Sequence, residues 1–179
     1  MDLSSAYLLV GGLFCLAGLL LFCCGERLAA PLNALPRSRI AAILLWSAAL
    51  TWFFYHLAGI SEVDLAGFPR WSFFALFGGA GILAFKFLED LLSLRAIAVL
   101  TLFVCNELLK IGFGHTPYSI VLAGTAYLLI VGALWTGASP YVLRNAIAFT
   151  TQNTSRARIV GSILFLLGLT NFTASFFVK

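Results

Sequence analysis

The chain has 179 residues, of which 61% are hydrophobic and 10% are charged, and its formal net charge is +4. This composition and the mean hydropathy of +1.02 lie far outside the range of soluble domains. The dispersed Lys and Arg residues form no long basic cluster, so they indicate cytoplasmic loops and contact with anionic lipid, and no nucleic-acid partner is expected.

We expect one all-α integral membrane domain over residues 1–179, because several apolar runs reach the roughly 20 residues that cross a bilayer. Six spans in three helical hairpins are predicted, at about residues 6–24, 40–60, 71–88, 94–113, 118–137 and 159–178. Proline breaks or kinks a helix interior, and all five prolines fall in the predicted connections. The first of these connections, residues 25–39, contains Pro31 and Pro36.

Small residues in the first and last spans predict close packing between helices. Gly11, Cys15 and Gly18 share one face of the first span. The last span carries a comparable stripe of small and polar residues: Gly161, Gly168, Asn171 and Ser175. We interpret both stripes as packing surfaces, because small side chains let helix backbones approach one another in a membrane.

Two segments are predicted to lie where the membrane meets water. Residues 52–56 are consecutive aromatic and histidine side chains, a pattern typical of the aromatic belt at a membrane surface. Residues 141–150 place apolar side chains on one helical face and Arg144 and Asn145 on the other. This second pattern predicts a short interfacial helix.

The distribution of Lys and Arg predicts the orientation of the chain. One side of the six-span arrangement receives eight basic residues: Arg27, Arg37, Arg39, Lys86, Arg95, Arg144, Arg156 and Arg158. The other side receives three, namely Arg70, Lys110 and Lys179. Since basic residues concentrate on the cytoplasmic side, both termini are expected on the outer side.

A faint internal repeat accompanies the arginines that open the even-numbered spans, Arg39, Arg95 and Arg158. The residues at the matching distance beyond them are Thr51, Glu107 and Thr170. Three hairpins around a common axis would bring these residues together at similar depth. Chance is the other explanation, because inner-side arginines recur in any chain with this topology.

Glu107 and Lys110 place an acid and a base within one predicted span. At 1.5 Å per residue, Glu107 lies about 18 Å beyond Arg95, where an unpaired carboxylate costs at least ~3 kcal/mol. Lys110 is its natural partner at i,i+3. Glu107 is therefore either half of a structural ion pair or a carboxylate that handles protons or cations. The candidate site comprises Glu107, Lys110, Asn106, Thr51, Thr170 and Asn171.

No pattern in the sequence points to catalysis, a metal or a cofactor. The four cysteines lie in or beside apolar runs without zinc-binding spacing. The two histidines, His56 and His115, also lack the spacing of metal or haem ligands. The motifs of metalloproteases, hydrolases and P-loop proteins are missing, so we expect a protein that is not an enzyme.

Two function hypotheses follow from these patterns. The favoured one is a non-catalytic structural or interaction subunit, with other membrane proteins as partners. The alternative is a small proton-coupled or cation/solute transporter or channel centred on Glu107. Composition favours the bacterial inner (plasma) membrane as the location of either.

Overall fold

The computed structural model describes residues 2–61, 63–65, 67–87 and 91–178, which form α-helices and short 3₁₀ turns without a strand. The α-helices are α1 (Leu3–Ala34), α2 (Arg39–Ala58), α3 (Arg70–Phe87), α4 (Leu92–Gly112), α5 (Ile120–Ala138), α6 (Pro140–Thr151) and α7 (Thr154–Ala174). The predicted all-α class is confirmed. Residue 88, the end of the third predicted span, lies outside the described residues.

Five helical segments among the described residues are long and apolar enough to cross a membrane. They are Leu3–Arg37, Arg39–Ala58, Leu92–Gly112, Ile120–Ala138 and Thr154–Phe177. Helix α3 is not among the five: it has 18 residues and carries Arg70 and Lys86 near its ends.

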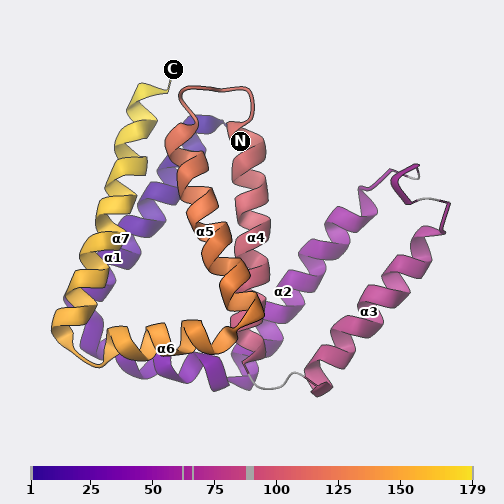
Figure 1. Cartoon of the computed structure of the whole chain (residues 1–179), viewed down its shortest axis with the longest axis horizontal. Coiled ribbons are helices and arrows are strands. Elements are labelled where there is room, and N and C mark those ends of the chain that lie inside the picture. Colours follow the sequence, from indigo (N-terminus) through magenta and orange to yellow (C-terminus); the bar gives the residue numbers. More distant parts are fainter. Residues whose placement is uncertain (1, 62, 66, 88–90, 179) are drawn as a thin grey trace.

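The helices form three antiparallel pairs, which approach one another at the end of the molecule opposite the chain termini (Figure 1). Helix α1 pairs with α7, so the two chain ends lie on the same side of the molecule, and α4 pairs with α5. Helices α2 and α3 form a hairpin in which α2 packs against α4 and α3 lies farthest from the other pairs. Helix α6 crosses the end of the molecule opposite the termini and connects α5 to α7.

The first helix is longer than predicted, because it continues through Pro31 to Ala34. The expected connection over residues 25–39, with every proline in a loop, is therefore wrong. A backbone kink at Cys24 (φ −121°, ψ 19°) turns the second half of α1 so that it lies beside α6 (Figure 1). Hydrogen bonds from Asn33 Nδ2 to Thr151 Oγ1 (2.8 Å) and from Thr154 Oγ1 to Glu26 Oε1 (2.6 Å) hold it there.

The α1–α7 pair has nearly direct backbone contact, as the small residues predicted. A β-carbon on Gly18 would lie 2.6 Å from the backbone nitrogen of Phe165, and one on Gly168 would lie 2.5 Å from that of Cys15. Gly11 and Gly161 are equally restricted by the backbone of the opposite helix. Only glycine fits at these four positions, because any side chain would push the helices apart.

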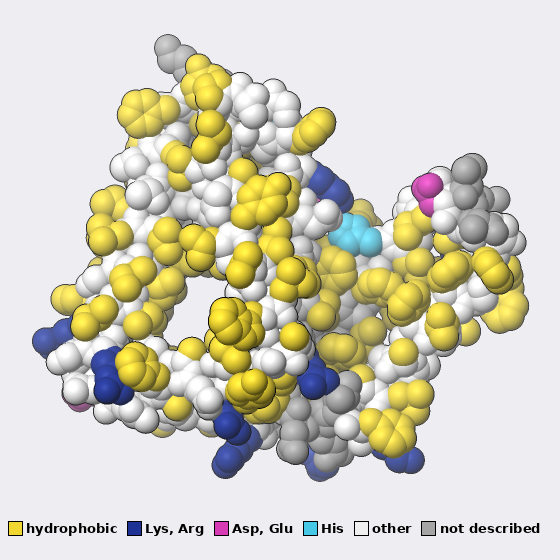
Figure 2. All heavy atoms as spheres, viewed as in Figure 1, with side chains coloured by type: hydrophobic (Ala, Val, Ile, Leu, Met, Phe, Trp, Pro, Cys, Tyr) yellow, Lys and Arg dark blue, Asp and Glu magenta, His cyan; other side chains and the backbone are white. Residues whose placement is uncertain are grey.

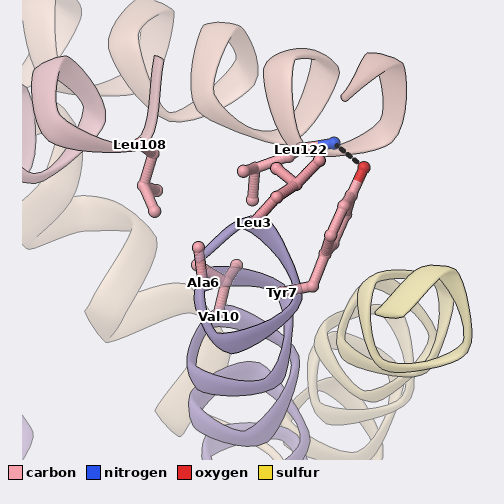
Figure 3. Close-up of a cluster of buried hydrophobic side chains, with 6 residues drawn as sticks. All are labelled: Leu3, Ala6, Tyr7, Val10, Leu108 and Leu122. Atoms are coloured by element: carbon pink, nitrogen blue, oxygen red, sulfur yellow. Dashed lines mark hydrogen bonds between the residues drawn. The ribbon is translucent and has the colours of Figure 1, made fainter. Parts of the chain in front are cut away.

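A buried cluster joins α1 to α4 and α5 near the termini (Figure 3). Its members are Leu3, Ala6, Tyr7, Val10, Leu108 and Leu122. The Tyr7 hydroxyl donates to the carbonyl oxygen of Tyr118 (2.8 Å) and accepts from the backbone N–H of Leu122 (3.0 Å). These bonds satisfy the buried hydroxyl and two backbone groups at the start of α5, which would be costly to leave unpaired.

The segment predicted as an interfacial helix does form a helix, α6, one residue longer at each end than expected. Most of the Lys and Arg side chains visible in Figure 2 gather at the edge of the molecule around α6. The same view shows an opening between α5 and the α1–α7 pair, edged mainly by hydrophobic side chains. The molecule thus has a basic end and a long apolar middle.

Candidate functional site: the Glu107 cluster

Helix α4 presents Glu107 beside a base from its own helix, as the spacing predicted. The Glu107 Oε1 atom accepts a hydrogen bond from Lys110 Nζ at 3.0 Å and another from Asn106 Nδ2 at 3.3 Å. The exposed fractions of the side chains are 40% for Glu107 and 58% for Lys110. The pair is therefore partly open to its surroundings and is not sealed in the core.

Helix α2 adds a third ionisable group, His56, to the same carboxylate. Its Nε2 atom lies 3.5 Å from Glu107 Oε1, is buried, and has no hydrogen-bond partner in the described part of the chain. The imidazole ring lies 5.5 Å from the ring of Phe103 and 6.5 Å from that of Trp52, measured between centroids. Trp52 and Phe103 also stack on each other at 5.7 Å. The aromatic rings thus position the imidazole beside the carboxylate.

The partners of Glu107, namely His56, Asn106 and Lys110, border a cavity of about 910 Å³ between the ends of α2 and α4, here called the α2–α4 notch. Its lining residues are Tyr55, His56, Ala58, Gly59, Ile60, Leu102, Phe103, Asn106 and Lys110. The lining combines apolar side chains with donors from Asn106, Lys110 and His56. The notch could therefore hold a group that is apolar over most of its surface and polar at one end.

The other predicted site residues lie elsewhere. Thr51 and Thr170 are exposed, and each donates to a carbonyl of its own helix, those of Ser47 and Leu167 at 2.8 Å. They lie on different helix pairs: α2 packs against α4 and α3, whereas α7 packs chiefly against α1. The structure therefore does not gather Thr51, Glu107 and Thr170 into one cluster.

Asn171 is fully buried at the contact between α7 and α5, away from the Glu107 cluster. Its Nδ2 atom donates to Thr125 Oγ1 at 3.0 Å and to the carbonyl oxygen of Leu167 at 2.9 Å. A buried amide among apolar helices needs such partners, and hydrogen bonds of this kind link helices inside membranes. The geometry of Asn171 is that of a structural link.

Sequence reasoning did not connect His56 with Glu107. The predicted topology places both residues toward the outer side, and this was the only signal for a contact between them. The contact depends on α2 packing against α4, and helix pairing cannot be read from hydropathy. In the part of the chain that the structure describes, no three His, Cys, Asp or Glu side chains form a group that could hold a metal ion.

Comparisons of the chain with protein-family models, curated proteins and solved structures found no match. Over the described residues, the fold defines an all-helical protein with five helices suited to crossing a membrane. Its most distinctive polar feature is a carboxylate between an imidazole and an ammonium group at the rim of an open notch.

Proposed function

We propose that this chain is a non-catalytic interaction subunit of a bacterial inner membrane, which binds a transmembrane helix of another membrane protein through the α2–α3 hairpin. All six predicted spans cross the bilayer in this proposal, and both termini lie on the outer side. The observation that carries it is the isolated position of α3, which packs chiefly against α2 (Figure 1).

Helix α2 packs closely against α4, whereas α3 packs chiefly against α2. Trp46 Nε1 donates to the carbonyl oxygen of Gly81 at 3.0 Å, and the ring centroids of Phe53 and Phe77 lie 4.8 Å apart. Toward α4, contact ends near His56, and beyond it the two helices diverge around the α2–α4 notch. Because α3 packs chiefly against α2, most of its surface is open to a partner.

The outward surface of α3 suits contact with a helix. Ala75 and Gly79 are exposed and lie one turn apart, and a β-carbon on Gly79 would meet nothing within 4 Å. Small residues at this spacing allow a second helix to approach closely. Leu76 and Ile82, which are also exposed, would pack beside that helix.

The length of α3 also favours a partner. Its 18 residues extend about 27 Å, slightly less than the ~30 Å hydrocarbon core. Arg70 and Lys86 near its ends can extend toward the headgroups, which makes a short span tolerable. Contact with a neighbouring helix further reduces the cost of this mismatch.

Photo-crosslinking in native membranes tests the proposal. A photoreactive amino acid replacing Ala75 should form one discrete adduct with a different membrane protein, identified by mass spectrometry. The same amino acid replacing Leu128, which is exposed on α5, should form none. The Gly79→Leu substitution should remove the Ala75 adduct, because a large side chain blocks close approach of the partner helix.

The matched control is Gly132→Leu on α5, where a β-carbon would also meet nothing within 4 Å. This variant should retain the Ala75 adduct. Equal adducts at Ala75 and Leu128, or an adduct that survives Gly79→Leu, would contradict the proposal. An adduct with a second copy of this chain would contradict the proposed partner, because it would show that this surface mediates self-association.

A second candidate function is proton- or cation-coupled transport, and the contact of Glu107 with both His56 and Lys110 favours it. A carboxylate and an imidazole in proximity can exchange a proton, and polar groups of this kind mark ion pathways in membrane proteins. The stacked rings of Trp52 and Phe103 adjoin the cluster, so a pathway toward the basic end would have to pass them.

A further inference from the structure

The close contact of α1 with α7 leaves an apolar groove on the surface of the pair. It has a volume of about 370 Å³ and is lined by Gly18, Leu19, Phe22, Gly161, Ser162, Phe165 and Leu166. The backbones of α1 and α7, in close contact at Gly18 and Gly161, form its floor, and Leu19, Phe22 and Leu166 are its exposed walls. We call this feature the α1–α7 groove.

A positive charge lies at one end of the α1–α7 groove. The guanidinium carbon of Arg158 is 5.9 Å from the centroid of the Phe22 ring, and the Arg158 side chain is exposed. Among the described residues, Arg158 has no carboxylate within ion-pair distance. The carboxylate of Glu26 accepts a hydrogen bond from Thr154 and forms no ion pair with Arg158.

We propose that the α1–α7 groove binds one acyl chain of an anionic phospholipid of the inner leaflet, with the lipid phosphate at Arg158. Ser162 and Leu166 lie about 6 and 12 Å along α7 from Arg158, at 1.5 Å per residue. In the orientation of the proposed function, on which this inference rests, the groove runs from the basic end of the molecule toward the middle of the bilayer. This is the path of an acyl chain whose headgroup lies at the inner surface.

The size and charge of the groove favour a lipid over a protein helix. A helix is about 10–12 Å wide with its side chains, more than a cavity of about 370 Å³ can enclose over several turns. A flexible acyl chain can follow the floor at the two glycines. An arginine at the inner surface attracts an anionic headgroup by about 1 kcal/mol, which is charge complementarity that an apolar helix lacks.

Native mass spectrometry of the full chain, released from nanodiscs, tests the proposal with phosphatidylglycerol and phosphatidylcholine of the same acyl chains as probes. The wild type should retain one phosphatidylglycerol more tightly than phosphatidylcholine. The Arg158→Gln variant should lose this preference, weakening phosphatidylglycerol binding about fivefold. Arg144→Gln on α6, an exposed arginine bonded to Asn145, is the matched charge control and should leave binding unchanged.

A second pair of variants tests the groove itself. Ser162→Phe should fill the groove and abolish retention of both lipids, whereas Ile163→Phe, at an exposed position beside it, should not. Equal retention of the two lipids by the wild type would overturn the proposal, as would tight phosphatidylglycerol binding in Arg158→Gln. Arg158 is exposed, so that variant decides the question even if Ser162→Phe fails to fold.

Discussion

Glu107 is the residue at which the two candidate functions diverge. Its carboxylate binds Lys110 at 3.0 Å and lies 3.5 Å from His56, so it has a structural partner and a proton-exchange partner at once. As half of an ion pair, Glu107 would contribute to stability only together with Lys110. As a proton- or cation-handling group, it would be required for transport even in a variant that folds normally.

Substitutions at Glu107 and Lys110 separate these possibilities. With a purely structural pair, Lys110→Ala should lower the free energy of unfolding by about 1 kcal/mol, the upper end for a partly exposed pair. Replacing both residues with Leu should restore the stability, because no uncompensated charge remains. Unfolding of the purified protein in detergent measures both changes.

Transport predicts a different result for the Glu107→Gln variant. This variant should insert and fold normally. Vesicles reconstituted with it should lack the pH-dependent flux of protons or cations that the wild type supports. If wild-type vesicles have no flux and the double-Leu protein is stable, the transport function loses its support and the interaction function gains it.

At this scale, the sequence predicts contacts within one helix better than contacts between helices. The i,i+3 spacing of Glu107 and Lys110 was enough to predict their ion pair, which the structure contains. The bonds of Tyr7 to the start of α5 join residues more than a hundred positions apart, and hydropathy carries no information about them.

At the scale of the elements, the glycine stripe determines how α1 and α7 pack. Gly168 on α7 lies against the backbone of Cys15, whereas Gly124 on α5 has open space at the position of a β-carbon. The two glycines are both in helix interiors, so helix propensity affects them alike. They differ only in the space available for a side chain.

We therefore expect opposite effects of alanine at these two sites. Gly168→Ala should lower the free energy of unfolding by about 1–3 kcal/mol, because the backbones of α1 and α7 must move apart. Gly124→Ala should be neutral or should raise stability by up to about 1 kcal/mol, since alanine favours a helix over glycine. Thermal unfolding in one detergent compares them, and a Gly168→Ala protein as stable as Gly124→Ala would refute the close contact.

The helix ends illustrate what apolar runs can predict. Helices α2, α4 and α5 begin and end within two residues of the predicted segments, because the length of an apolar run determines each of them. Helix α7 begins five residues earlier than predicted, in the polar segment before its apolar run. The second half of α1 was missed because Pro31 and the nearby arginines resemble a loop. Its helical state is supported by hydrogen bonds to α6 and to the start of α7, which no local pattern reveals.

At the scale of the whole molecule, both proposed sites depend on how the chain crosses the bilayer. The basic residues near α6 and the second half of α1 would lie at the inner surface, with Arg158 at the mouth of the α1–α7 groove. The α2–α4 notch would then open at the outer surface. Helix α3 determines this arrangement, because the helices after it reverse direction if it does not cross.

Cysteine labelling of intact cells tests this threading most directly. In a chain freed of its four native cysteines, single cysteines would replace Asp64, His115, Arg37 and Gln152, all of which are exposed. A membrane-impermeant maleimide should label positions 64 and 115 in intact cells, and positions 37 and 152 only after lysis. Labelling of position 64 together with protection of position 115 would mean that α3 does not cross the membrane, and would contradict the six-span arrangement.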